Sequence, residues 1–160
     1  INRCLVGSEM CIRDSDSTGR YLQEKGHEFG TVTGRDRRCG WIDLVSLKQM
    51  IDINGINSIA LTKLDVLSGL KTIKICTEYE ISGKKYDYLP ASQKLQNLAE
   101  PTYIEMPGWE DDISDITKYK NLPEEAKNYI EYLQEKLATP IDIISTGPDR
   151  NATIILKKYF

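Results

Sequence analysis

Two short apolar runs, far apart in the sequence, constrain the fold of this 160-residue chain more than any other feature. The first extends from Ala60 to Asp65 and the second from Ile141 to Pro148. Each run is aliphatic or β-branched and stops at small or charged residues, which is typical of a buried parallel strand whose carboxyl end opens onto a ligand crevice. We therefore expect an α/β fold in which the two strand ends contribute to one site.

The first run ends in Lys63-Leu64-Asp65, a pattern that suits recognition of guanine. A carboxylate there can accept hydrogen bonds from the N1–H and the exocyclic amine of the base, while a lysine stem lies along its face. Adenine lacks this pair of donors, and a buried acceptor left unpaired costs about 1–3 kcal/mol. Charged residues follow strands in many proteins, so the tripeptide alone leaves a solvated strand end as the alternative.

A glycine- and arginine-rich segment precedes the first run, from Gly26 to Trp41. It contains four glycines and three arginines. Glycines let backbone N–H groups approach an anion, threonine hydroxyls add donors, and arginine forks match carboxylate and phosphate oxygens. The segment therefore predicts a loop that binds an acidic substrate.

Four motifs in the order found here resemble the C-terminal part of adenylosuccinate synthetase, over about Asp16 to Phe160. They are Gly26 to Trp41, Leu61 to Leu70, Met106 to Trp109, and Pro140 to Arg150. The resemblance implies an α/β, P-loop-NTPase-like fold, of which this chain holds the C-terminal part of a mostly parallel sheet with flanking helices, plus an antiparallel hairpin. It also implies a cytoplasmic homodimer that joins IMP to L-aspartate. The family uses GTP as co-substrate, with Mg²⁺, to phosphorylate the purine O6, and the aspartate amine then displaces that phosphate.

The resemblance also assigns substrate-binding roles to residues of this chain. The aspartate loop would consist of Thr31, Val32, Thr33, Gly34, Arg35, Asp36 and Arg37. Within it, Arg35 would also reach IMP, and Arg37 would reach the GTP phosphates. The guanine base would be held by Lys63, Leu64 and Asp65 from the first strand end, and by Ser145, Thr146 and Gly147 from the second.

The groups that perform phosphoryl transfer in this family belong to an N-terminal region with no match in the chain. The sequence has no G-x-x-x-x-G-K-[ST] phosphate loop. We expect no catalytic residue and no metal ligand within it, and the Mg²⁺ ligands are expected in the missing region. The single histidine, His27, has no nucleophile paired with it by pattern and is interpreted as a turn residue.

The first fifteen residues match nothing in the family at that place and resemble a translated sequencing adapter. We therefore interpret residues 1–15 as non-native and residues 16–160 as the C-terminal part of a single synthetase domain. A divergent loop is the alternative for the first segment.

Composition excludes several classes of partner. A net charge of −3, with 28% charged residues, gives no electrostatic footprint for nucleic acid or a membrane surface. The four cysteines lack paired C-x-x-C spacing, which indicates free thiols in a reducing compartment.

Two further functions remain open at this point: a regulatory GTP-binding module, which would have no use for the threonine- and arginine-rich loop, and a non-catalytic structural fragment.

Local patterns place the other elements. Ser82-Gly83-Lys84 predicts the turn of an antiparallel hairpin. The expected elements are a helix from Asp43 to Gly55, a strand from Ile59 to Thr62, a hairpin from Ile73 through Tyr88, a helix from Pro123 to Leu137, a strand from Ile141, and a strand from Thr153 to Leu156.

Overall fold

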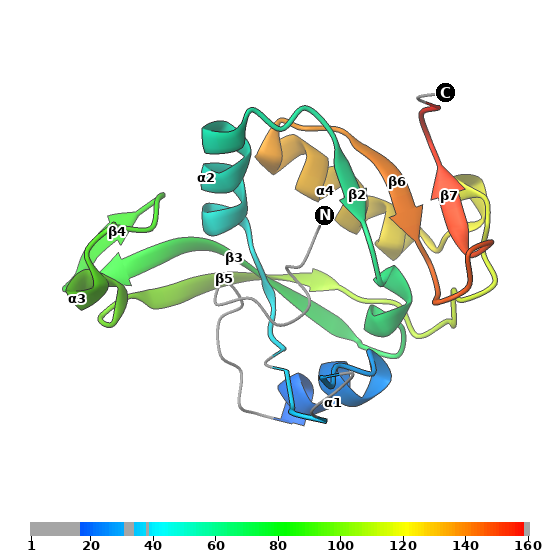
Figure 1. Cartoon of the computed structure of the whole chain (residues 1–160), viewed down its shortest axis with the longest axis horizontal. Coiled ribbons are helices and arrows are strands. Elements are labelled where there is room, and N and C mark those ends of the chain that lie inside the picture. The colour runs from blue at the N-terminus through cyan, green and yellow to red at the C-terminus, as the bar shows by residue number, and fades with distance from the viewer. Residues whose placement is uncertain (1–16, 31–33, 38, 159–160) are drawn as a thin grey trace.

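The structure is a computed structural model that describes residues 17–30, 34–37 and 39–158. Its helices and strands form two sheets with helices packed against them (Figure 1). The elements are α1 (Ser17–Lys25), β1 (Ile42–Asp43), α2 (Leu44–Asn54), β2 (Ile59–Leu61), η1 (Leu64–Leu67), β3 (Thr72–Ile81), β4 (Lys84–Tyr86), α3 (Gln93–Gln96), β5 (Glu100–Pro107), η2 (Tyr119–Asn121), α4 (Glu124–Leu137), β6 (Ile141–Ser145) and β7 (Thr153–Ile155).

The two apolar runs form neighbouring parallel strands, as predicted. β2 pairs with β6, and Leu61 lies opposite Ile144 in the register. β7 extends this sheet on the other side of β6, where it runs antiparallel. Because β2 and β6 point the same way, their carboxyl ends meet at one edge, beside η1 and α1 (Figure 1).

The second sheet is organised around the long strand β3. β1 pairs with β3 in parallel, whereas β4 and β5 pair with it antiparallel. The predicted hairpin is confirmed, but its second strand ends at Tyr86 and Tyr88 lies outside it. β5 has no counterpart among the predicted elements. Its sequence carries Pro101 and Pro107, and prolines argue against a strand when only the sequence is read.

The two predicted helices, α2 and α4, begin and end close to where their sequences predict, whereas α1 and α3 were not predicted. The Asp43 side chain accepts hydrogen bonds from the N–H groups of Val45 (3.0 Å) and Ser46 (3.1 Å), and so caps α2. Gly55 ends the helix in the left-handed conformation, with φ 60°. α4 follows Pro123 and has two glutamates in its first turn. Their negative charges stabilise the helix by interacting with the positive end of its dipole.

A continuous hydrophobic core joins α4, β2, β6 and η1. Leu61, Leu64, Ile130 and Ile144 are fully or almost fully buried in it. Burial of this kind fixes the ends of β2 and β6 relative to each other, because apolar area removed from water stabilises by about 25 cal/mol per Å². Within the described residues, no helix is long and apolar enough to cross a membrane.

Candidate functional site

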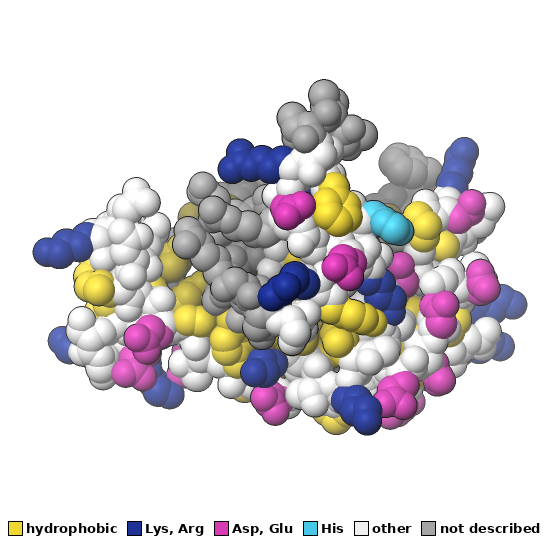
Figure 2. Space-filling view, turned by 90° about the horizontal axis from the view of Figure 1, so that it is seen from below, with side chains coloured by type: hydrophobic (Ala, Val, Ile, Leu, Met, Phe, Trp, Pro, Cys, Tyr) yellow, Lys and Arg dark blue, Asp and Glu magenta, His cyan; other side chains and the backbone are white. Residues whose placement is uncertain are grey.

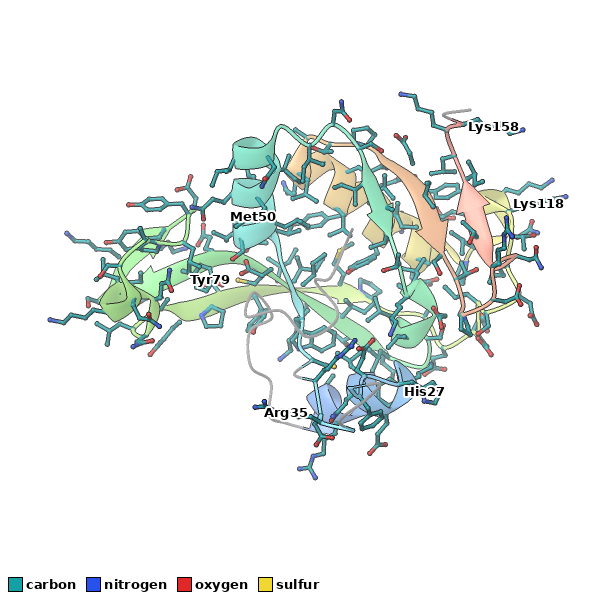
Figure 3. The ribbon with its side chains drawn as sticks, in the orientation of Figure 1. His27, Arg35, Met50, Tyr79, Lys118 and Lys158 are labelled. Carbon is teal, nitrogen blue, oxygen red and sulfur yellow. The ribbon has the colours of Figure 1, made fainter. Side chains whose placement is uncertain are left out.

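A cavity of about 410 Å³ opens at the carboxyl ends of β2 and β6. It brings together residues from both strand ends, from η1 and from the turn after α1. They are Lys25, Gly26, His27, Thr62, Lys63, Asp65, Val66, Ser145, Gly147 and Pro148. His27 has a φ of 49° and lies in the turn after α1, as predicted, on the same part of the molecule as Arg35 (Figure 3). On the face shown in Figure 2, acidic and basic side chains are interspersed around His27, the one side chain in cyan.

Asp65 is one of the residues that line this cavity, and one of its carboxylate oxygens is buried without a hydrogen-bond partner among the described residues. It lies in the first turn of η1, and the oxygen concerned is Oδ1. Burial raises the pKa of this carboxyl above its ordinary value, and its own main-chain N–H and the charges of Lys25 and Lys63 only partly offset that rise. A buried polar atom without a partner is costly, so this one indicates a ligand that donates hydrogen bonds.

Lys63 is held in place by two acceptors, the carbonyl of the lining residue Gly26 and the carboxylate of Glu28. Its backbone is in the left-handed region at the junction of β2 and η1, with φ 61°. Its Nζ donates to the carbonyl of Gly26 (2.8 Å) and to Oε1 of Glu28. Because the amine is tied at its far end, the methylene stem of Lys63 forms part of the cavity wall. Burial lowers the pKa of this amine, and the nearby Asp65 opposes the change.

The glycine- and arginine-rich loop is a hairpin whose stem the structure describes. Phe29 and Asp36 form an antiparallel bridge. The N–H of Arg37 donates to the carbonyl of Glu28 (3.0 Å), and the N–H of Gly30 donates to the carbonyl of Arg35 (2.8 Å). Thr31, Val32 and Thr33 lie outside the described residues. The predicted aspartate loop therefore contributes four described residues, Gly34, Arg35, Asp36 and Arg37, and all four are exposed.

The second strand end is shaped by its small residues. The Ser145 hydroxyl donates to the carbonyl of Gly147 (2.9 Å), which curves the chain after β6 around the cavity. A Cβ on Gly147 would lie 3.3 Å from the carbonyl oxygen of Ser114 and 3.2 Å from the Cβ of Ala152. These contacts are tight, so the curve of this segment favours glycine.

Comparison with known proteins assigns the chain to a family. Residues 5–154 match the family model of adenylosuccinate synthetase, a range that includes part of the segment 1–15, whose interpretation as non-native stays a prediction. The chain belongs to the adenylosuccinate synthetase family. It is 49% identical over 144 residues to the adenylosuccinate synthetase of Caldanaerobacter subterraneus subsp. tengcongensis, covering 90% of this chain and 34% of that protein. It is 52% identical over 140 residues to the Fusobacterium nucleatum synthetase, covering 88% of this chain and 33% of that protein.

A solved structure confirms the fold. The fully ligated adenylosuccinate synthetase of Plasmodium falciparum superimposes with a TM-score of 0.87 at 41% identity, covering 95% of this chain and 36% of that one. The predicted α/β class is thereby confirmed. The chain spans about a third of the length of the curated relatives it matches.

Within this family fold, the predicted guanine residues divide into two groups. Lys63, Asp65, Ser145 and Gly147 line the cavity. Leu64 is instead buried in the hydrophobic core, and the hydroxyl of Thr146 donates to the carbonyl of Ile116 (2.8 Å), away from the cavity. Arg37 does not line the cavity and pairs with Glu28 at 3.2 Å.

Sequence reasoning missed Glu28, which is only 1% exposed and contacts both Lys63 and Arg37. The one signal for it was that it is one of only two carboxylates, with Asp36, in an arginine-rich segment. The lining residues Lys25, Thr62 and Val66 were also not predicted as site residues.

The described residues do not form a metal centre. They contain no group of three or more His, Cys, Asp or Glu side chains that could hold a metal ion. The expectation that the Mg²⁺ ligands lie outside this chain stays a prediction.

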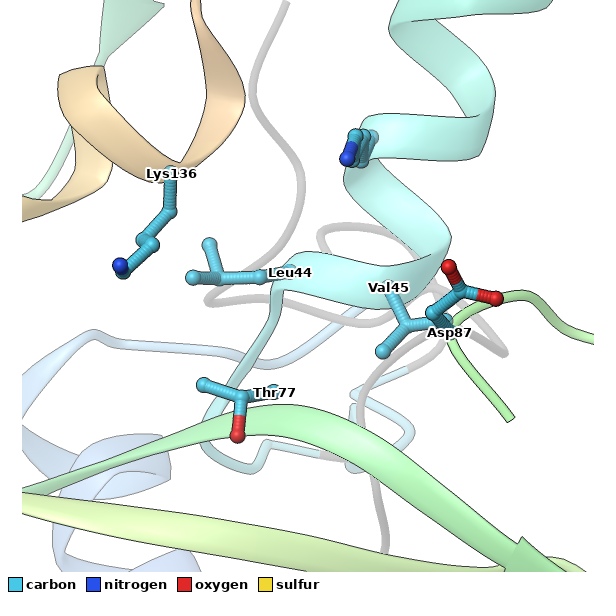
Figure 4. A pocket seen from close by; sticks show the side chains of 6 residues that line it. Leu44, Val45, Thr77, Asp87 and Lys136 are labelled. Atoms are coloured by element: carbon cyan, nitrogen blue, oxygen red, sulfur yellow. The ribbon is translucent and has the colours of Figure 1, made fainter. Parts of the chain in front are cut away.

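A second, smaller cavity of about 150 Å³ lies between α2, β3 and α4 (Figure 4). Its lining combines apolar side chains of α2 with Lys48, Asp87 and Lys136. It has no buried acceptor or donor lacking a partner among the described residues, in contrast to the cavity that contains Asp65. We therefore place the candidate nucleotide site at the larger cavity.

Proposed function

We propose that this chain is part of an enzyme that ligates L-aspartate to IMP at the expense of GTP, and that it supplies the guanine cavity and the substrate loop. The unpartnered, buried Oδ1 of Asp65 carries this proposal. A carboxylate at that point can accept from the N1–H and from the exocyclic amine of guanine, and no other common base offers this pair of donors. Membership of the synthetase family supports the reaction.

The remaining assignments follow the family motifs. Thr31 to Arg37 would close on aspartate, with Arg35 also reaching IMP and Arg37 the GTP phosphates. Arg35 and Arg37 lie at exposed positions of the hairpin, where guanidinium forks suit anionic substrates, and Arg37 also pairs with Glu28. Mg²⁺ would be held by residues outside this chain, and the whole enzyme would be a cytoplasmic homodimer. Cys39 and Cys76 are free and buried.

Nucleotide binding tests the guanine assignment directly. Titration calorimetry of the 160-residue chain should show binding of GDP and much weaker binding of ADP, with IDP in between because inosine lacks the exocyclic amine. Equal binding of the three nucleotides, or none, would contradict the assignment.

A chimaera tests the reaction. Residues 16–160 would replace the matching segment of the Fusobacterium nucleatum synthetase, and adenylosuccinate formation would be followed with IMP, aspartate, GTP and Mg²⁺. Activity in the chimaera supports the ligase role. A folded chimaera that binds GDP without making product would favour the alternative of a GTP-binding module.

A further inference from the structure

Glu28 is the most deeply buried carboxylate beside the cavity, and its two oxygens contact different parts of the site. Oε1 accepts from Nζ of Lys63, and Oε2 accepts from Nη1 of Arg37 at 3.2 Å. Its side chain is 2% exposed, whereas those of Lys63 and Arg37 are 40% and 48% exposed. A buried carboxylate must be paired, and Glu28 is paired with both cations at once, while Lys63 also donates to the carbonyl of Gly26.

The two cations belong to different elements. Lys63 follows β2 and lines the cavity, and it lies 35 positions from Glu28 in the sequence. Arg37 is on the far strand of the hairpin, where its N–H also donates to the carbonyl of Glu28 (3.0 Å). Glu28 is therefore the shared partner of the cavity wall and the hairpin stem.

We propose that Glu28 is a positioning residue that couples the guanine cavity to the substrate hairpin. When a base lies along the stem of Lys63, the amine of that residue is kept on Glu28, and the Glu28–Arg37 contact keeps the hairpin closed. Coupling of this kind is reciprocal, so a closed hairpin also favours the bound base. The ligand part of this inference depends on the proposed guanine site, whereas the mechanical link between Lys63 and the hairpin does not.

Amide hydrogen exchange of the ligand-free, full 160-residue chain tests the mechanical link. Lys63→Met should speed exchange of the Gly30 and Arg37 amides several-fold, because Glu28 loses one of its partners and the hairpin opens more often. In a Glu28→Gln background the same change should add nothing, since the link is already broken.

Lys25→Met is the matched control. Lys25 lines the same cavity, but its amine donates to the hydroxyl of Tyr21 (3.0 Å) and to the carbonyl of Ser68, not to Glu28. It should leave exchange in the hairpin unchanged. An equal effect of the two lysine variants, or no effect of Lys63→Met, would overturn the link. Glu24→Gln, the same chemical change at an exposed position of α1, controls for Glu28→Gln.

Guanosine tests the ligand part, because it has no phosphate that could touch Arg37. Its binding should slow exchange of the hairpin amides in the wild-type chain and not in Glu28→Gln, while amides of β2 and β6 are slowed in both. Slowing of the hairpin in Glu28→Gln as well would refute the role of Glu28. A wild-type chain that does not bind guanosine would refute the proposed guanine site, and the lysine variants would still decide the link.

Discussion

Replacing Asp65 by asparagine should move base preference from guanine to xanthine. The amide keeps the shape of the side chain but presents one acceptor and one donor where the carboxylate has two acceptors. Its NH₂ group then faces a donor of guanine, and one of two hydrogen bonds is lost. Xanthine has a carbonyl oxygen in place of the exocyclic amine and can accept from that group.

The expected loss of GDP affinity follows from the guanine donor that the Asp65→Asn substitution leaves without an acceptor. A buried polar group without a partner costs about 1–3 kcal/mol, so GDP should bind roughly 5- to 150-fold more weakly to Asp65→Asn than to the wild-type chain. XDP should bind more tightly to the variant than to the wild type. Titration calorimetry with both nucleotides measures the switch.

The same substitution should stabilise the ligand-free chain. Oδ1 of Asp65 is buried without a partner among the described residues, and burial raises the pKa of the carboxyl, so its charged form opposes folding. At pH 7 the free energy of unfolding should rise by about 1 kcal/mol in Asp65→Asn. This advantage should be present above the raised pKa of Asp65 and should shrink as pH falls through it, because the wild-type carboxyl then becomes neutral.

Asp52→Asn, at an exposed position of α2, is the matched control and should change neither property. An Asp65→Asn chain that keeps the wild-type preference for GDP over XDP would refute the guanine assignment. Lower stability of the variant at pH 7 would refute the inference that the carboxylate is held at a cost.

Three other predictions test separate features. The affinity of the wild-type chain for GDP should fall in acid as Asp65 becomes protonated, and because the pKa of Asp65 is raised, the fall should occur at a higher pH than for an ordinary aspartate. The affinity of Asp65→Asn should not show this fall, and calorimetry across pH measures both chains. In the chimaera, Arg35→Lys should raise the KM values for aspartate and IMP, because an ammonium cannot replace the planar fork; unchanged kinetics would exclude a substrate contact there. Gly108→Ala should lower the free energy of unfolding by about 2–4 kcal/mol, because the added Cβ would lie 2.0 Å from the carbonyl oxygen of Leu70. At Gly83 the added Cβ meets open space, so Gly83→Ala should lower the free energy of unfolding by only about 1–2 kcal/mol, through the positive φ at that position. Urea unfolding of the two variants compares these costs.

Local sequence patterns were sufficient to predict the strand ends that form the cavity. β2, β6 and the cap of α2 at Asp43 depend on neighbouring residues, and the structure has each of them near its predicted place. The motif could not indicate which of its consecutive residues face the ligand. The left-handed backbone of Lys63 begins a tight helical turn, and this turn buries Leu64 in the core while Asp65 lines the cavity.

Long-range pairing explains what the sequence did not indicate. Glu28 gains its partner Lys63 only when β2 is brought beside the turn after α1, and no periodicity reports such a contact. β5 pairs along most of β3, yet its own residues are largely half-exposed and do not alternate clearly. β5 could therefore be identified as a strand only from its pairing with β3.

The open edge of β2 leads to a last prediction, on the chain studied by itself. Among the described residues β2 pairs with β6 and with no other strand, so its second edge has unpaired backbone groups. Ile53 and Ile155, on α2 and β7, are 69% and 58% exposed. Open edges and exposed apolar side chains favour association between copies.

We therefore expect the 160-residue chain to self-associate as its concentration rises, and to form no adenylosuccinate from IMP, aspartate and GTP with Mg²⁺. Phosphoryl transfer needs a phosphate loop, a metal and an acid–base pair, and the sequence offers no candidate for them. Sedimentation velocity over a range of concentrations measures the association, and the chimaera is the positive control for the assay. A sharply melting monomer would show that the edge of β2 is protected without a neighbour, and turnover by the chain alone would place the reaction centre within it.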